Sequence, residues 1–297
     1  MVSFLQVLVV GLGLAAIYTL LALGFVIVYK STGILNFAYP GMMALGAYGV
    51  VHLSVVWGWP FLLATALAIG ATALLGMLIE RSVVRPMITK PVFSIIIATL
   101  GLDIILRAFA NRAIGVDVRN LGDPWGFSVV LLGDVTVQQR HVVMIVVTVA
   151  VVAALAVFFK RSRWGIAMRA TALDREVAAM QGISLGAVFV ISWALAGALA
   201  ALAGMFVGTG SGFDQQSAFV ALKAIPAMIL GGMDSIGGAL VGALIIGLAE
   251  ALTAAYQPVY LPALGSQFSL VVPYLVMIAV LIFRPYGLFG TSEVKRA

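Results

Sequence analysis

Long apolar runs alternate with short polar segments along the whole chain. Most of these runs approach the ~20 residues that an α-helix needs to cross the hydrocarbon core of a bilayer. The nine runs are Leu5–Val28, Leu35–Val51, Pro60–Ile79, Val92–Asn111, His141–Phe159, Leu185–Gly208, Ala218–Leu230, Gly237–Tyr256 and Phe268–Phe283. They are continuously apolar, whereas membrane strands alternate. The pattern therefore predicts an all-α polytopic membrane protein, because a backbone inside a membrane must satisfy its own hydrogen bonds.

Two of the nine runs are short and interrupted. Leu35–Val51 contains Pro40 and Gly41, and Ala218–Leu230 contains Pro226 and is followed by two glycines. Broken helices in both halves of a transporter mark a binding or permeation site near the middle of the membrane. We expect about 8–9 membrane segments, including these short or discontinuous ones, in a single transmembrane domain over residues 1–297.

Composition limits the other possibilities. The chain is 63% hydrophobic and 9% charged, so no soluble domain can be separated from it. Met1–Phe4 carries no positive charge, so we expect the first run to be retained rather than cleaved as a signal peptide. The chain has no cysteine, and its two histidines, His52 and His141, form no metal-binding motif. No phosphate-binding loop is present either. We therefore expect no catalytic residue, bound metal or cofactor, and no ATP hydrolysis by this chain alone.

The basic residues predict the orientation. Twelve of the seventeen lysines and arginines fall on one side if the runs alternate across the membrane. They are Lys30, Arg81, Arg85, Lys90, Lys160, Arg161, Arg163, Arg169, Arg175, Arg284, Lys295 and Arg296. That side is expected to be cytoplasmic, with the N-terminus outside and the C-terminus inside. The net charge of +6 then reflects membrane topology rather than nucleic-acid binding.

The most strongly charged stretch, residues 160–185, carries seven charges in a chain with few. Its apolar residues recur at spacings of four and three, which places them along one side of a helix. These residues are Ile166, Ala170, Leu173, Val177 and Met180. Thr171 and Asp174 form a capping box, and Gly182 is placed to end the helix, so we expect a short helix over 172–181. The loop either lies on the bilayer surface or docks a soluble partner.

An external loop is expected over residues 112–140. Two β-prone runs flank Gly133 and Asp134, which predicts a small hairpin. It could cap an entrance, receive an external partner or be merely structural.

Four charges fall inside the apolar runs, where charge is costly and often functional. Asp103 and Arg107 are four residues apart and can pair on one helix face. Lys223 and Glu250 could pair across two helices. The Asp103–Arg107 pair is either a structural ion pair or part of a solute path.

Glycines gather between Leu230 and Gly242, in the run LGGMDSIGGALVG. Such glycines permit close helix packing, and they also permit non-helical backbone beside a cavity. Candidate path residues in this run are Gly231, Gly232, Ser235, Gly237 and Gly238. Their counterparts in the first half are Asn36 and Tyr39.

Three segments resemble one known family, the branched-chain amino acid ABC transporter permeases of the LivH type. Gly33–Tyr48 (GILNFAYPGMMALGAY) resembles its N-terminal signature, and Leu230–Glu250 (LGGMDSIGGALVGALIIGLAE) resembles its C-terminal glycine motif. Gly165–Ile183 (GIAMRATALDREVAAMQGI) resembles the cytoplasmic loop that engages the ATPases. One departure stands out: Tyr39-Pro40-Gly41 replaces the common His-Gly-Glu or His-Gly-Asp.

The resemblance implies an assembly in the cell (inner or plasma) membrane. Two permease subunits, copies or paralogues, would sit with two ATPases that bind ATP and Mg, and an extracytoplasmic binding protein would deliver solute. The ATPase contacts would come from seven residues of the cytoplasmic loop: Gly165, Arg169, Ala170, Asp174, Arg175, Ala178 and Gly182.

The function that the resemblance implies is ATP-driven import of branched-chain or other small amino acids and related polar solutes. An ion-coupled secondary transporter is the alternative, with Asp103, Lys223 or Glu250 carrying the coupling ion. An intramembrane enzyme is a distant third.

Overall fold

The computed structural model describes residues 4–114, 117–126, 128–132, 135–210, 212–265 and 267–290. Within this part of the chain, seven helical spans are long and apolar enough to cross a membrane, and two shorter apolar ones accompany them. The predicted fold class is thereby confirmed. The long helices are α1 (Phe4–Thr32), α2 (Tyr39–Val51), α3 (Phe61–Ile79), α5 (Val92–Ile114), α6 (Gln139–Arg161), α9 (Leu185–Gly208) and α11 (Ile236–Tyr260).

Several spans continue through irregular turns. α2 runs into a π-helical turn, His52–Val56, and α3 runs through a second one, Glu80–Val84, into the short α4 (Arg85–Met87). The seventh predicted run is a 3₁₀ helix, Ser217–Lys223, followed by α10 (Ala224–Gly231). Two further 3₁₀ turns, Pro262–Leu264 and Phe268–Leu270, precede α12 (Val272–Phe283).

The predicted start of the second span is wrong. The chain from Gly33 to Ala38 is non-helical, and α2 begins only at Tyr39. Pro40 lies in the first turn of α2, where its missing N–H leaves no hydrogen bond unmade. The interruption therefore precedes α2 instead of breaking it.

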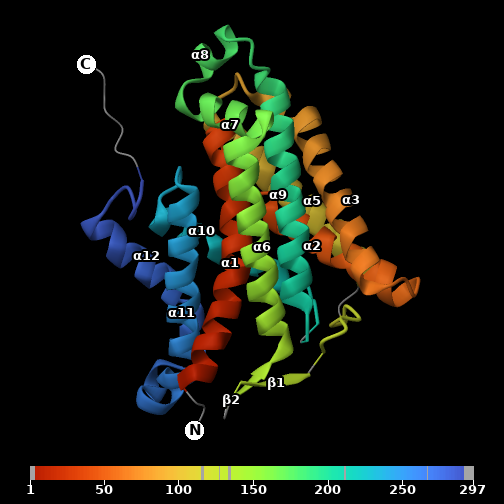
Figure 1. The fold of residues 1–297 in the computed structure, drawn as a ribbon, viewed down its shortest axis with the longest axis vertical. Coiled ribbons are helices and arrows are strands. Elements are labelled where there is room, and N and C mark those ends of the chain that lie inside the picture. Colours follow the sequence, from red (N-terminus) through yellow and green to blue (C-terminus); the bar gives the residue numbers. More distant parts are fainter. Residues whose placement is uncertain are drawn as a thin grey trace.

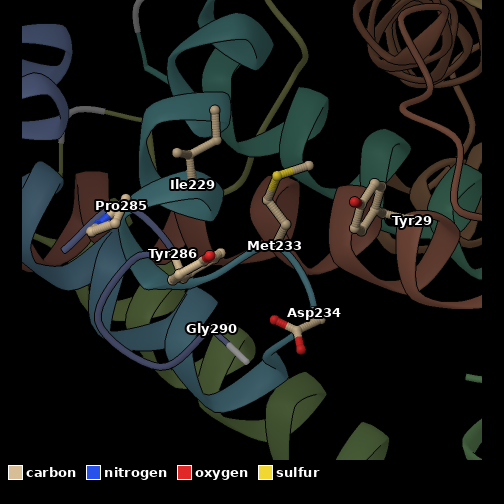
Figure 2. A pocket seen from close by; sticks show the side chains of 7 residues that line it. All are labelled: Tyr29, Ile229, Met233, Asp234, Pro285, Tyr286 and Gly290. Carbon is tan, nitrogen blue, oxygen red and sulfur yellow. The ribbon is translucent and has the colours of Figure 1, made fainter. Parts of the chain in front are cut away.

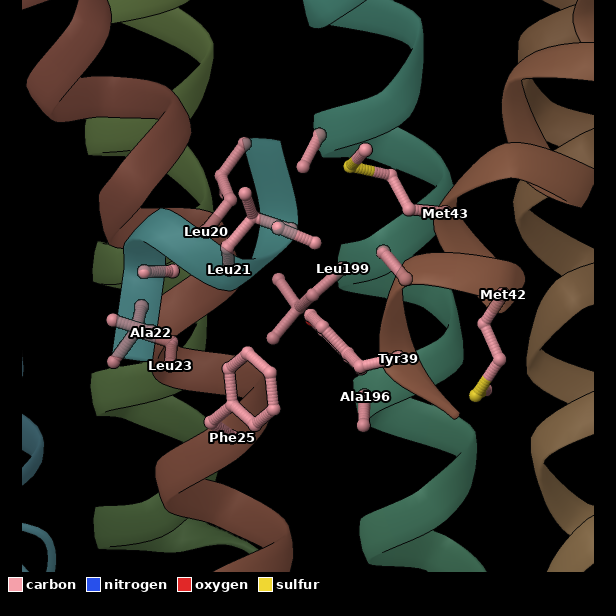
Figure 3. Close-up of a cluster of buried hydrophobic side chains, with 14 of the residues drawn as sticks. Leu20, Leu21, Ala22, Leu23, Phe25, Tyr39, Met42, Met43, Ala196 and Leu199 are labelled. Atoms are coloured by element: carbon pink, nitrogen blue, oxygen red, sulfur yellow. The ribbon is translucent and has the colours of Figure 1, made fainter. Parts of the chain in front are cut away.

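The centre of the bundle is formed by α1, which packs against α9 and α11, while α9 also packs against α2 and α3. Small residues bring these helices close together: Gly46 of α2 lies against Ala201 of α9, and Gly247 of α11 lies against Ala15 of α1. Figure 3 shows the resulting cluster, in which Leu20, Leu21 and Tyr39 are fully buried. Large apolar side chains on α3, α5 and α6 are exposed instead, as expected for lipid-facing surfaces.

The two ends of the molecule differ (Figure 1). One end carries α7 (Arg163–Leu173) and α8 (Arg175–Met180). The opposite end carries the start of α1 and an antiparallel hairpin of β1 (Val129–Leu132) and β2 (Val135–Gln138). The predicted hairpin is confirmed, although Gly133 and Asp134 lie outside the described residues.

Long-range hydrogen bonds hold segments at both ends. The Gln6 side-chain amide donates to the Thr136 carbonyl, at 3.1 Å, which fastens the hairpin to α1. At the other end, the guanidinium of Arg85 donates to the Gly186 carbonyl at 2.8 Å. Lys30 and Arg169 line one small pocket at that end. Basic segments that lie far apart in sequence thus share the α7–α8 end.

Candidate functional site

Side chains of α5 accept backbone amides in and just after the first interrupted segment, Gly33–Ala38. The amide of Phe37 donates to the Thr99 hydroxyl at 3.3 Å, and the amide of Gly41 donates to a carboxylate oxygen of Asp103 at 2.7 Å. A carboxylate at this place is favourable because the first amides of a helix are unpaired and carry partial positive charge. Asn36 is buried, and its side-chain oxygen accepts the amide of Ala38 at 3.0 Å.

Asp103 also forms the predicted ion pair. A guanidinium nitrogen of Arg107 lies 2.6 Å from its second carboxylate oxygen, so the pairing is confirmed. The carbon of the same guanidinium lies 4.9 Å from the centre of the Phe219 ring, which is a cation–π distance. Phe219 belongs to Ser217–Lys223, so this contact reaches the second interrupted segment.

A second buried polar cluster fixes the other side of that segment. The ammonium of Lys223 lies 2.7 Å from one carboxylate oxygen of Glu250, which confirms the predicted pairing across helices. The hydroxyl of Tyr18 on α1 donates to the other oxygen at 2.5 Å. The Glu250 side chain is only 8% exposed, so both partners offset the cost of burying its charge.

Tyr39 lies deep in the hydrophobic cluster (Figure 3). Its ring centre is 4.6 Å from that of Phe25, and its hydroxyl lies against Gly24, where a Cβ would collide with it. The hydroxyl has no hydrogen-bond partner in the described part of the chain. Tyr39 therefore fits here because residue 24 is glycine, and its assignment to a solute path stays a prediction.

At the α7–α8 end, side-chain caps fix where α7 and α8 begin. The Ser162 hydroxyl accepts the amide of Gly165 at 2.8 Å, and Gly165 itself packs tightly against Phe158 and Phe159. The Asp174 carboxylate accepts the backbone amides of Glu176 and Val177, at 2.9 and 3.0 Å, and so caps the start of α8. Gly182 has a φ of +82°, which confirms the predicted left-handed residue after the helix.

The predicted single helix over 172–181 is wrong. Thr171 is buried inside α7, where its hydroxyl donates to the Ala167 carbonyl at 2.9 Å, so it caps nothing. Asp174 has extended backbone angles and separates two helices. The capping residue is thus the acidic member of the expected box, because its carboxylate competes for the amides of the following turn.

Four members of the predicted apolar stripe are uncovered. The exposed fractions are 49% for Ile166, 89% for Leu173, 48% for Val177 and 77% for Met180. We call these four exposed residues, two on α7 and two on α8, the docking face. Around it Arg169, Asp174 and Arg175 are exposed, Ala170 is half-buried and Ala178 is buried.

α8, which carries part of the docking face, contacts the start of the first interrupted segment. A guanidinium nitrogen of Arg175 lies against Gly33. Gly33 directly follows α1 and has a φ of +66°. A side chain at residue 33 would collide with that guanidinium. α8 and the start of Gly33–Ala38 are therefore in contact through Arg175.

Residues 7–281 match the family described as "Branched-chain amino acid transport system / permease component". The chain belongs to this family. Family membership makes it a membrane permease component and not itself a catalyst.

The permease is similar to several curated relatives over nearly its full length. It is 32% identical to the high-affinity branched-chain amino acid transport system permease protein LivH of Escherichia coli K12, covering 99% of this chain and 97% of the relative. It is 31% identical to the high-affinity permease protein BraD of Pseudomonas aeruginosa, covering 99% and 98%. Among solved structures, a chain of PsaBC from Streptococcus pneumoniae in complex with Fab matches 92% of the permease and 90% of that chain, with a TM-score of 0.49 and 14% identity.

In the permease, the glycine run lies at the α7–α8 end, since its Ile236 lines the same small pocket as Arg169. Gly231 and Gly238 pack backbone against backbone, which brings α10 and α11 together, and the Ser235 hydroxyl accepts the amide of Gly238 at 3.0 Å to begin α11. Gly232 has a φ of +109°, and Gly237 is exposed with open space around it. These placements explain helix packing and capping, and a role of the run in a solute path stays a prediction.

A pocket of about 330 Å³ adjoins this run (Figure 2). Its lining residues are Tyr29, Ile229, Met233, Asp234, Pro285, Tyr286 and Gly290. The chain after α12 closes one side, since the amides of Leu288 and Phe289 donate to the Leu230 and Gly231 carbonyls at 2.8 and 3.0 Å. The turn residues Met233 and Asp234, rather than the candidate glycines, therefore face this space.

Sequence reasoning missed three residues of the buried clusters. Tyr18 lies near the middle of the first apolar run, where its hydroxyl needs a partner, and that was an available signal. Thr99 precedes Asp103 by one helical turn and could have been grouped with it. Phe219 gave no signal, because an aromatic residue in an apolar run is ordinary.

Proposed function

We propose that this permease is the transmembrane subunit of an ATP-driven ABC importer for branched-chain or other small amino acids and related polar solutes. Its partners would be two ATPase subunits that bind ATP and Mg, a second permease that is a copy or a paralogue, and an extracytoplasmic binding protein. The names of the curated relatives support the solute class.

The observation that carries the proposal is the docking face. An uncovered apolar patch rimmed by charges marks a protein interaction site. Leu173 is 89% exposed at the basic end of the molecule, where lipid does not cover it if that end projects into the cytoplasm. The seven loop residues named above would then contact the ATPases directly or support the helices that do.

The distribution of basic residues supports the orientation. Lys30, Arg85 and Arg169 lie at the α7–α8 end, so the positive-inside rule favours a cytoplasmic location for this end. The N-terminus, at the hairpin end, would then be extracytoplasmic and the C-terminus cytoplasmic. The molecule would span the cell (inner or plasma) membrane in contact with lipid.

The contacts suggest how ATP would drive transport. A shift of α8 would act through Arg175 on Gly33 and thus on the first interrupted segment. Asp103 and Arg107 would pass that shift to Phe219 and the second interrupted segment. Rigid-body rocking of packed helices is the ordinary means of such alternating access.

The ion-coupled alternative receives less support. Asp103, Lys223 and Glu250 each hold an opposite charge in a close pair, and each pair joins elements of the fold. Binding and releasing a coupling ion at any of them would break the tie that positions an interrupted segment.

Reconstitution tests the proposal. Proteoliposomes holding the permease, its binding protein and candidate ATPases should take up leucine only with ATP. Leu173→Asp should abolish this uptake by placing a charge in the docking face, whereas Ile88→Asp, at another exposed apolar site of the same end, should retain it. Uptake that follows an ion gradient without ATPases would contradict the proposal.

A further inference from the structure

A second pocket, of about 450 Å³, lies at the hairpin end of α2. Its lining residues are Tyr48, Val51, His52, Val55, Val56, Val118, Arg119 and Asn120. The volume falls within the ~300–1,000 Å³ that is usual for small-molecule sites. The helix that forms one wall, α2, begins directly after the first interrupted segment.

Both walls of this pocket are fastened in place. The hydroxyl of Ser54 donates to the Leu121 carbonyl at 2.5 Å, which ties α2 to the segment after α5. The backbone of Arg119 pairs with that of Phe213 through hydrogen bonds of 3.0 and 2.8 Å. Three segments far apart in sequence are therefore joined to one another beside the pocket.

The π-helical turn His52–Val56 supplies part of the pocket lining. A π-turn widens a helix locally and occurs frequently at functional sites. Here the turn contributes His52, Val55 and Val56 to the lining. The Tyr48 hydroxyl lies 3.1 Å from the His52 Nδ1, so these two polar groups are already positioned by each other.

We propose that this pocket is an entrance site that binds an apolar L-α-amino acid before it enters the membrane. The inference rests on the proposed function and orientation, and it adds a location and a set of contacts. Arg119 is the charged lining residue; it already has a partner within the chain, and its planar fork of five donors can hold a carboxylate as well. Val51, Val55, Val56 and Val118 supply an aliphatic wall for the side chain. The face and oxygen of Tyr48 would receive the ammonium group.

Leucine titration of the full-length permease in lipid nanodiscs tests this proposal. The Trp57 ring centre lies 5.2 Å from that of His52, so tryptophan fluorescence should report binding, and Trp57→Phe should remove the signal. Radiolabelled leucine measured in parallel gives the affinity without any reporter. Leucinamide, which lacks the carboxylate, should not compete.

Two variants decide the outcome. Arg119→Gln should weaken leucine binding by about tenfold or more, because a charge-assisted contact is lost. Arg112→Gln, an exposed arginine outside the pocket lining, is the matched control and should bind as wild type. A thermal unfolding midpoint equal to that of wild type would show that Arg119→Gln is folded. If Arg119→Gln does not fold, Arg119→Lys replaces it as the test, and this variant should keep part of the leucine affinity.

Three results would overturn the proposal: no saturable leucine binding by the wild type at millimolar concentration, unchanged affinity in Arg119→Gln, or equal competition by leucinamide. Each is distinguishable from failure of the proposed function. ATPase-dependent uptake by the reconstituted importer is measured separately and would persist if only this site were wrong.

Discussion

The guanidinium of Arg107 lies over the ring of Phe219, 4.9 Å from its centre, and this contact joins the two interrupted segments of the permease. On one side Arg107 pairs with Asp103, which receives the amide of Gly41 in the first turn of α2. On the other side Phe219 lies one turn before Lys223, which is held by Glu250. The four charges inside the apolar runs thus form a framework around both interrupted segments.

Asp103 is expected to stabilise α2 mainly as an acceptor for the Gly41 amide. Asp103→Asn keeps a side-chain oxygen at this place, whereas Asp103→Leu leaves a buried amide without a partner. We expect Asp103→Leu to be less stable than Asp103→Asn by about 1–3 kcal/mol, the usual cost of an unsatisfied buried group. Thermal unfolding of the purified variants in detergent measures the difference. Equal midpoints would show that the hydrogen bond at 2.7 Å contributes nothing.

Lys223 and Glu250 should behave as a coupled pair. Replacing one member, as in Lys223→Met or Glu250→Gln, should destabilise the fold by about 3–5 kcal/mol, because the remaining charge is buried without its partner. The double variant should lose clearly less than the sum of the two single losses. Additive losses in a double-mutant cycle would mean that the two side chains do not interact, despite their distance of 2.7 Å.

We expect that the buried position of Tyr39 requires glycine at residue 24. A methyl group at residue 24 would collide with the Tyr39 ring and hydroxyl, so Gly24→Ala should cost about 1–3 kcal/mol of stability through overpacking. The same change should be better tolerated together with Tyr39→Leu, which frees the space. If Gly24→Ala is equally harmful in both backgrounds, as judged by unfolding midpoints, the two residues are not in contact.

Much of this fold could be predicted from local sequence. Continuous apolar runs gave the membrane helices, and the i,i+4 spacing of Asp103 and Arg107 gave their ion pair, because both are properties of a single helix. The left-handed conformation of Gly182 could be predicted because helices commonly end at a glycine in that conformation. The basic loops gave an expected orientation in the same way.

Contacts between distant segments could not be predicted this way. Tyr18 and Glu250 are separated by 232 residues, and the sequence around each residue does not show which other helix it faces. The break at Asp174 was missed because Thr171 matched the capping pattern, while the decisive factor was that α7 continues through Thr171 from its own cap at Ser162. The glycine run was ambiguous because packing and cavity lining require the same small residues.

Asp174 should act in docking by beginning α8 rather than through its charge. Asp174→Asn retains a capping oxygen, whereas Asp174→Ala loses it at a cost of about 0.5–2 kcal/mol of helix stability. We expect Asp174→Asn to bind the ATPase nearly as wild type and Asp174→Ala to bind it more weakly, by pull-down or calorimetric titration. Equal loss in both variants would instead indicate a direct charge contact.

The most direct test concerns the docking face itself. The chain has no cysteine, so Leu173→Cys provides a single labelling site at its most exposed position. A maleimide dye should label this cysteine rapidly in the permease alone and slowly once the cognate ATPase is added, whereas Ile88→Cys should be labelled equally with and without it. If the ATPase binds the permease and Leu173→Cys remains as reactive as before, α7 and α8 are not the docking surface.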